Sequence, residues 1–265
     1  MTRPRILLTN DDGVNSVGIW AAYEALSVFA DVTVCAPAVQ QSAAGRSISI
    51  FDALRMTEVV INGHPAYAVG GRPTDALLLG IHGLKCKPDL VVSGVNLGEN
   101  ISTESVTTSG TVGAAMEAVN QGFPAVAFSM EMVNDGDKFS DPRTLQIDFT
   151  QVKKVISDLV LLYLKEGLPK GASLVNVNIP SGEVKGYKVT KLAPRIFDTS
   201  VETRLDPRGK PYYWICGDML SEGAEDSDVY ALQHGYVSVT PLTLDNTAFA
   251  ACDNTESQLH RAGFL

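Results

Sequence analysis

Two adjacent carboxylates, Asp11 and Asp12, are the residues of this sequence with the clearest chemical potential. They follow a short apolar run at residues 5–9 and precede Gly13. Neighbouring carboxylates repel each other and are costly to bury unless a cation lies near them. An ordinary Asp-Asp-Gly turn is the alternative, but the position directly after an apolar strand favours a cation site.

Further oxygen donors follow the next predicted strands. Ser42 comes after the strand at residues 31–36, and Asn96 comes after the strand at residues 89–93. Ligands of open parallel sheets bind at the carboxyl ends of the strands, so these side chains are expected at the same edge as the two aspartates. Together they form an all-oxygen donor set, which suits Mg²⁺ or Mn²⁺.

Ser109, Gly110 and Thr111 precede an alanine-rich helix predicted over residues 111–121. The segment has two interpretations, which the sequence leaves open. A hydroxyl can cap the free amides of the first turn, or the same amides and the positive end of the helix dipole can bind a phosphate.

Other catalytic chemistries lack support in the sequence. The four histidines and four cysteines have no metal-ligand spacing, and there is no Gly-x-Ser-x-Gly motif. The formal net charge of −9 comes with no run of Lys and Arg, which argues against binding a nucleic-acid polymer. No apolar stretch has the length of a membrane span and no signal sequence opens the chain, so we expect a cytoplasmic protein without a membrane partner.

Short apolar runs alternate with longer helical patterns through the first half of the chain. Strands are predicted at residues 5–9, 31–36, 66–69, 89–93, 124–129 and 174–179, and helices at 18–29, 74–83, 111–121 and 149–166. This alternation predicts an α/β fold with a parallel sheet wrapped by helices. The pattern changes after Gly182. Residues 187–192 and 212–216 are predicted to form an extended hairpin with a turn at 206–209, before a late strand at 236–241.

With these residues in view, the chain resembles the survival protein SurE family of metal-dependent nucleotidases. The resemblance rests on ILLTNDDG (6–13), QSAAGRSISI (41–50), VVSGVNLGEN (91–100), TSGTVGAAMEA (108–118) and GYVSVTPL (235–242). It implies a Rossmann-like three-layer core over residues 1–182. It also implies a C-terminal β-hairpin subdomain over residues 183–265, whose late strand returns to the core and whose hairpin serves oligomerisation.

The resemblance also implies roles for particular residues. The ligands of one Mg²⁺ or Mn²⁺ per subunit are expected at Asp11, Asp12, Ser42 and Asn96. The phosphate-binding segment is expected at Ser109, Gly110 and Thr111, with Asn10 and Gly94 nearby. A homodimer or homotetramer is the implied assembly.

We therefore predict a phosphomonoesterase that hydrolyses nucleoside 5′- and 3′-monophosphates by attack of a metal-associated water. Asp11 or Asp12 would act as the base, and Ser109 as a covalent nucleophile is the alternative mechanism. A dinucleotide-binding oxidoreductase would need GxGxxG in the first turn, and an aspartyl-phosphate phosphatase often has an Asp-x-Asp pair there. A non-catalytic nucleotide-binding regulatory module remains as the alternative function.

Overall fold

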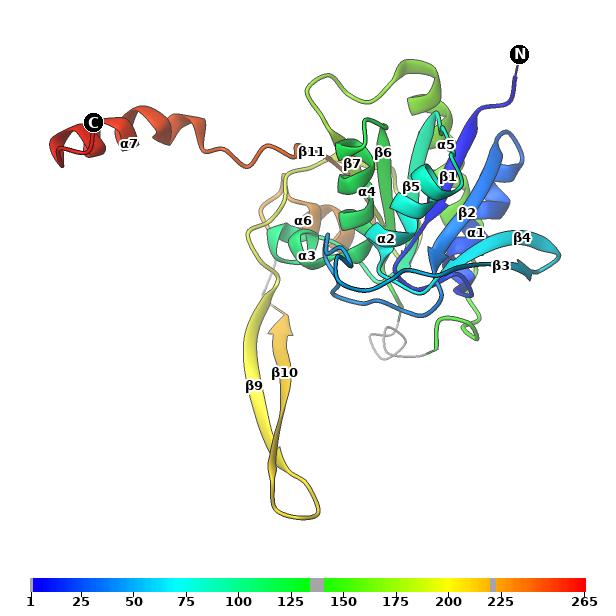
Figure 1. The fold of residues 1–265 in the computed structure, drawn as a ribbon, viewed down its shortest axis with the longest axis horizontal. Helices are drawn as coiled ribbons and strands as arrows, with labels where there is room; N and C mark the ends of the chain where they lie inside the picture. Colours follow the sequence, from blue (N-terminus) through cyan, green and yellow to red (C-terminus); the bar gives the residue numbers. More distant parts are fainter. Residues whose placement is uncertain (1, 134–140, 220–222) are drawn as a thin grey trace.

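The computed structural model describes residues 2–133, 141–219 and 223–265. A nine-stranded sheet forms the centre of the molecule (Figure 1). Its strands are β1 (Arg5–Thr9), β2 (Asp31–Pro37), β3 (Met56–Ile61), β4 (His64–Val69), β5 (Leu90–Leu97), β6 (Ala125–Met130), β7 (Leu174–Ile179), β8 (Tyr187–Val189) and β11 (Val237–Leu242). The helices are α1 (Val17–Ser27), α2 (Pro73–Leu78), the π-helix η1 (Leu79–Gly83), α3 (Ser102–Thr108), α4 (Gly110–Asn120), α5 (Thr150–Glu166), α6 (Asp228–Gln233) and α7 (Phe249–Arg261).

The strand order β3-β4-β2-β1-β5-β6-β7-β11-β8 places a change of direction beside β1. From β1 the chain first moves to β2 on one side, and it later returns to β5 on the other side, with parallel pairing on both. In open α/β sheets this switch point is where ligands bind, at the carboxyl ends of the strands. The first strand therefore delivers Asp11 and Asp12 to the switch point.

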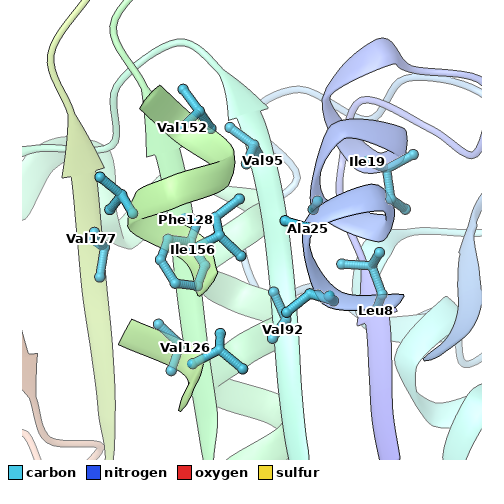
Figure 2. Close-up of a cluster of buried hydrophobic side chains, with 14 of the residues drawn as sticks. Leu8, Ile19, Ala25, Val92, Val95, Val126, Phe128, Val152, Ile156 and Val177 are labelled. Carbon is cyan, nitrogen blue, oxygen red and sulfur yellow. The ribbon is translucent and has the colours of Figure 1, made fainter. Parts of the chain in front are cut away.

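Helices α1 and α5 cover one face of the sheet (Figure 2). Phe128 and Ile156 are fully buried there. Each such side chain contributes about 1.5–3 kcal/mol through removal from water. The continuous apolar runs of the sequence, such as the fully buried strand β6, reflect this two-sided coverage.

Helices α2 and α4 cover the opposite face. The small side chains of α4 allow a close approach to the sheet, and Ala115 and Ala118 are fully buried. The α/β fold with helices on both faces of a mostly parallel sheet, as predicted, is confirmed.

The second half of the chain differs in detail from the sequence-based expectation. Residues 187–189 do not form an arm of the hairpin; as β8 they pair in parallel with β11 at the edge of the main sheet. The hairpin consists instead of β9 (Phe197–Leu205) and β10 (Pro211–Met219), which pair antiparallel around the predicted turn. The prediction was wrong here because a β-rich pattern indicates a strand but not its partner.

The hairpin and α7 both extend away from the sheet (Figure 1). Apart from the half-buried Phe197, every residue of β9 is exposed, and none of α7 is buried. The exposed fractions of Trp214 and Ile215 are 57% and 82%. No helix in the described ranges is long and apolar enough to cross a membrane.

Candidate active site

Asp11 lies at the carboxyl end of β1, against the first turn of α4. The side chain is only 6% exposed, and its Oδ1 accepts a hydrogen bond from Thr111 Oγ1 at 2.5 Å. Burial raises the pKa of Asp11, while hydrogen bonds from Thr111 and from the amides of Thr111 and Gly110 act in the opposite direction. A Cβ on residue 110 would lie 2.8 Å from the Cβ of Asp11, so only glycine permits this close approach.

Asp12 points to the end of β5, which neighbours β1 in the sheet. Its Oδ2 accepts a hydrogen bond from the Leu97 amide at 3.0 Å, and its Oδ1 faces Gln40 Nε2 at 3.4 Å. Burial, together with the negative charge of Asp11, raises the pKa of Asp12 to about 7. Two buried carboxylates in sequence are a costly arrangement, and a cation between them would relieve the cost.

Asn10 shapes the turn that presents the two aspartates. Its Oδ1 accepts from the Gly13 amide and its Nδ2 donates to the Gly13 carbonyl, both at 3.2 Å. Gly13 has φ +94°, which glycine adopts without strain. In this structure the Asn10 side chain closes the turn, so the sequence-based assignment of Asn10 to substrate contact stays a prediction.

Ser42 lies on the loop that follows β2. The preceding residue, Gln41, donates its amide to the carbonyl of Asp11 at 2.7 Å, which brings this loop beside the aspartates. The Ser42 side chain is exposed. The backbone of this loop is therefore close to the acidic pair, and the assignment of the Ser42 hydroxyl as a ligand stays a prediction.

Asn96 and Gly94 come from β5, the other strand at the switch point. Asn96 Nδ2 donates to the Gly98 carbonyl at 2.6 Å, which leaves the amide oxygen as the atom that can face a cation. Gly94 has φ +128°, and a Cβ there would lie 2.2 Å from the Phe128 carbonyl oxygen. Gly94 is therefore required by the close passage of β5 along β6.

Ser109 is the N-cap of α4, and its Oγ accepts from the Val112 amide at 3.1 Å. The capping interpretation is therefore confirmed. It leaves the hydroxyl proton of Ser109 free to be donated, because a serine hydroxyl accepts and donates at once. Capping and phosphate binding are compatible at this residue.

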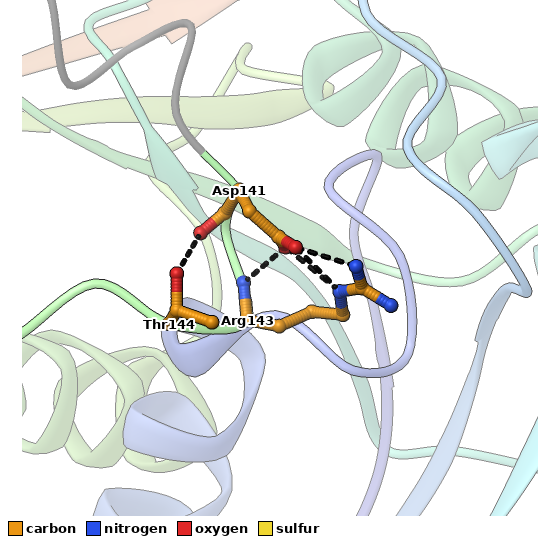
Figure 3. A network of polar contacts seen from close by, with 3 residues as sticks. All are labelled: Asp141, Arg143 and Thr144. Carbon is orange, nitrogen blue, oxygen red and sulfur yellow. Dashed lines mark hydrogen bonds and ion pairs between the residues drawn. The ribbon is translucent and has the colours of Figure 1, made fainter.

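A pocket of about 340 Å³ opens beside Asp12. Gln40 and Arg143 line it, and the Arg143 guanidinium is paired with Asp141 at its rim (Figure 3). This pairing lowers the pKa of Asp141 to about 2. The pocket extends the site beyond the acidic pair into a space that a small organic group can enter.

The donors at the site are oxygens of carboxylate, hydroxyl and amide groups. No group of three or more His, Cys, Asp or Glu side chains suited to a metal occurs within the described ranges. A set with two carboxylates and neutral oxygens fits a hard cation such as Mg²⁺ or Mn²⁺ better than Zn²⁺. The buried acidic pair supplies the negative charge that such a cation needs.

Sequence reasoning missed Gln40 and Arg143. Gln40 lies three residues beyond the carboxyl end of β2. Because ligands bind at this edge of the sheet, its position could have identified it as a candidate site residue. Arg143 lies in a polar stretch between β6 and α5, and nothing in its local sequence distinguishes it.

The fold and the site define an α/β protein with an acidic oxygen-donor centre at the sheet's switch point, facing a helix N-terminus. A family model described as "Survival protein SurE" matches residues 6–199. The chain belongs to the SurE family.

Relatives are similar over nearly the whole chain. A protein of Methanocorpusculum labreanum named 5′-nucleotidase SurE is 63% identical, with 98% of each chain covered. A protein of the same name from Methanoregula boonei is 58% identical over 96% of this chain and 98% of its own. The crystal structure of the SurE protein from Aquifex aeolicus superposes with a TM-score of 0.81 at 37% identity, covering 96% of this chain and 99% of that one.

Proposed function

We propose that this protein is a divalent-metal-dependent phosphomonoesterase that hydrolyses nucleoside 5′-monophosphates, and also 3′-monophosphates, to nucleoside and phosphate. The observation that carries the proposal is the pair Asp11–Asp12, buried at the switch point and directly beside the N-terminus of α4. The relatives named 5′-nucleotidase support the substrate class.

Asp11, Asp12, Ser42 and Asn96 would hold one Mg²⁺ or Mn²⁺. When bound, such a cation supplies positive charge to the phosphoryl oxygens and lowers the pKa of a nearby water. The two carboxylates are held in place by hydrogen bonds from Thr111 and from the Leu97 amide.

The phosphoryl group lies at the N-terminus of α4 in this proposal. The Ser109 hydroxyl donates to a phosphoryl oxygen, and the positive end of the α4 dipole attracts the phosphate, although the amides of Gly110 and Thr111 are directed at Asp11. Phosphoryl transfer depends chiefly on positioning and on charge stabilisation. The nucleoside then extends into the pocket lined by Gln40 and Arg143.

A water molecule attacks phosphorus in line with the leaving ester oxygen. Its proton passes to Asp11 or Asp12, and the ester oxygen takes a proton as nucleoside departs. Inversion of configuration at a chiral phosphorus would support a single displacement by water, whereas retention would indicate Ser109 as a covalent nucleophile.

We also propose that the protein acts as a homodimer or homotetramer in the cytoplasm and that the β9–β10 hairpin contributes to the contact. The exposed apolar side chains of β10, including Tyr213, Trp214 and Ile215, support this. Exposed apolar patches of this kind commonly mark protein contacts.

Release of phosphate from a panel of nucleoside monophosphates, with Mg²⁺ or Mn²⁺ and with EDTA, tests the function. We expect turnover that EDTA abolishes and that added metal restores. Full activity of metal-free protein would exclude metal dependence. Nucleotide binding without turnover would favour the non-catalytic nucleotide-binding module.

A further inference from the structure

Helix α3 joins the two parts of the proposed site. It begins shortly after Asn96 and ends at Thr108, directly before Ser109. The Ser109 amide donates to the Ser105 carbonyl at 2.8 Å, so the N-cap of α4 is also bonded to the last turn of α3. A displacement of α3 would therefore displace Ser109.

The beginning of α3 is held by a residue from the second half of the chain. Asp228 is fully buried, and its Oδ2 accepts from the Ser102 amide at 2.7 Å. Its Oδ1 accepts from the amides of Ala193 and Val229, both at 2.9 Å. Ser102 has φ +68°, a conformation that costs a non-glycine residue energy and persists where its surroundings enforce it. Asp228 supplies that constraint.

The base of the hairpin is attached to the same helix. Glu104 Oε2 accepts from the amides of Ile196 at 3.2 Å and of Phe197, the first residue of β9, at 3.4 Å. Beneath these bonds Ile101 packs in one buried apolar cluster with Ile196 and Val229. The hairpin base, α3 and α6 therefore form one packed unit.

The end of α3 also contacts the loop that carries Ser42. The Thr108 carbonyl accepts from the Gly45 amide at 2.8 Å. The Gly45 carbonyl faces α4 at Gly113. A Cβ on residue 113 would lie only 2.4 Å from this carbonyl oxygen. The loop is thus packed tightly against the end of α3 and the first turns of α4.

We infer that α3 is a positioning element that couples the base of the β9–β10 hairpin to the phosphate-binding turn at Ser109, with Glu104 and Asp228 as its positioning residues. The inference rests on the proposed function for its effect on catalysis. Neither carboxylate touches the substrate; each acts through backbone amides that set where α3 begins and how the hairpin base is seated. Contacts made by the hairpin are consequently transmitted to phosphate binding.

Glu104→Ala is the first test, because it removes the acceptor at the hairpin base without replacing any residue of the site. The matched control is Asp89→Ala, since Asp89 also accepts from a distant backbone amide, that of Arg5 at 2.8 Å, but lies at the opposite edge of the sheet. We expect the inhibition constant of inorganic phosphate and the KM for nucleotide to rise about tenfold in Glu104→Ala. The midpoint of thermal unfolding should match that of the control, and Glu104→Gln, which retains one acceptor oxygen, should restore most of the affinity.

Hydrogen exchange of the free protein makes the test independent of activity. Amides of residues 105–112 should exchange faster in Glu104→Ala than in Asp89→Ala. Ile196→Ala, which loosens the hairpin base from the opposite side, should do the same if Glu104→Ala does not fold. Unchanged exchange in these amides, or an unchanged phosphate constant in an active enzyme, would overturn the coupling. A wild-type protein that neither binds phosphate nor hydrolyses nucleotides would instead refute the proposed function, and exchange would still decide the coupling.

Discussion

The carboxyl edge of the main sheet and the β9–β10 hairpin differ in what they bury: the first buries charged side chains, and the second exposes apolar ones. At the sheet edge, Asp11 and Asp12 are almost completely buried, and each is held by hydrogen bonds from other elements. In the hairpin, apolar side chains such as Ile215 are exposed, and among the strands that the structure describes β9 and β10 pair only with each other. Buried charge in the first region and uncovered apolar surface in the second are both costly in the isolated chain, and the proposed cation and the proposed subunit contact would relieve the two costs.

Asp12→Asn should have the largest effect on this contrast. The amide keeps an acceptor for the Leu97 amide but removes the charge, so we expect activity to fall by about a thousandfold or more. The thermal midpoint should not fall, because the repulsion from Asp11 is also removed. Asp31→Asn, at the opposite end of the sheet in an exposed ion pair with Arg3, is the control and should retain activity. An active Asp12→Asn enzyme would remove Asp12 from the site.

The same substitution made in both regions measures the difference in burial. Ile156→Ala in the core should lower the free energy of unfolding by about 2–5 kcal/mol, because it leaves a cavity against the sheet. Ile215→Ala in the hairpin should change it by less than about 0.5 kcal/mol at a concentration where the protein is monomeric. Chemical denaturation provides both values. Comparable losses would show that the isolated hairpin is packed against its own chain.

Gly113→Ala tests the contact between the Ser42 loop and α4. The new Cβ would lie 2.4 Å from the Gly45 carbonyl oxygen, so the loop must shift. We expect the free energy of unfolding, measured by chemical denaturation, to fall by about 1–3 kcal/mol. Phosphate release should also fall at a temperature where the variant is still folded, so unfolding alone would not explain the loss of activity. Gly182→Ala has open space around the new methyl group and serves as the control. Wild-type turnover in Gly113→Ala would separate the loop from catalysis.

Arg143→Gln should have the smallest effect. The guanidinium lies at the rim of the pocket but is already neutralised by Asp141, so its attraction for an anionic substrate is weakened. We expect the KM for nucleotides to rise by about two- to fivefold with kcat unchanged. Steady-state kinetics with nucleoside monophosphates measures KM and kcat separately. A large fall in kcat would place Arg143 at the reacting centre.

Light scattering measures the oligomeric state and so tests whether the exposed hairpin contacts another subunit. Trp214→Ser removes exposed apolar surface without touching the core. On dilution, the oligomer of this variant should therefore dissociate at a higher protein concentration than the wild-type oligomer does. A wild-type protein that is strictly monomeric at micromolar concentration would contradict the proposed assembly.

The sequence by itself determined the alternation of strands and helices, because strands buried on both faces must be continuously apolar. It also supplied the candidate site residues: Asp11 and Asp12 after the first strand, and Ser109 before an alanine-rich helix, are visible as residue types at strand and helix ends. The tertiary structure decided what local patterns do not encode. It placed residues 187–189 in the main sheet rather than in the hairpin, since a strand's partner depends on long-range pairing. It turned Asn10 inward to close its own turn, brought Gln40 and Arg143 to one pocket, and joined α3 to the hairpin base through Glu104 and Asp228. The bonds of Glu104 to Ile196 and of Asp228 to Ser102 join residues 92 and 126 positions apart, and only the packing of the whole chain brings such residues within hydrogen-bond distance.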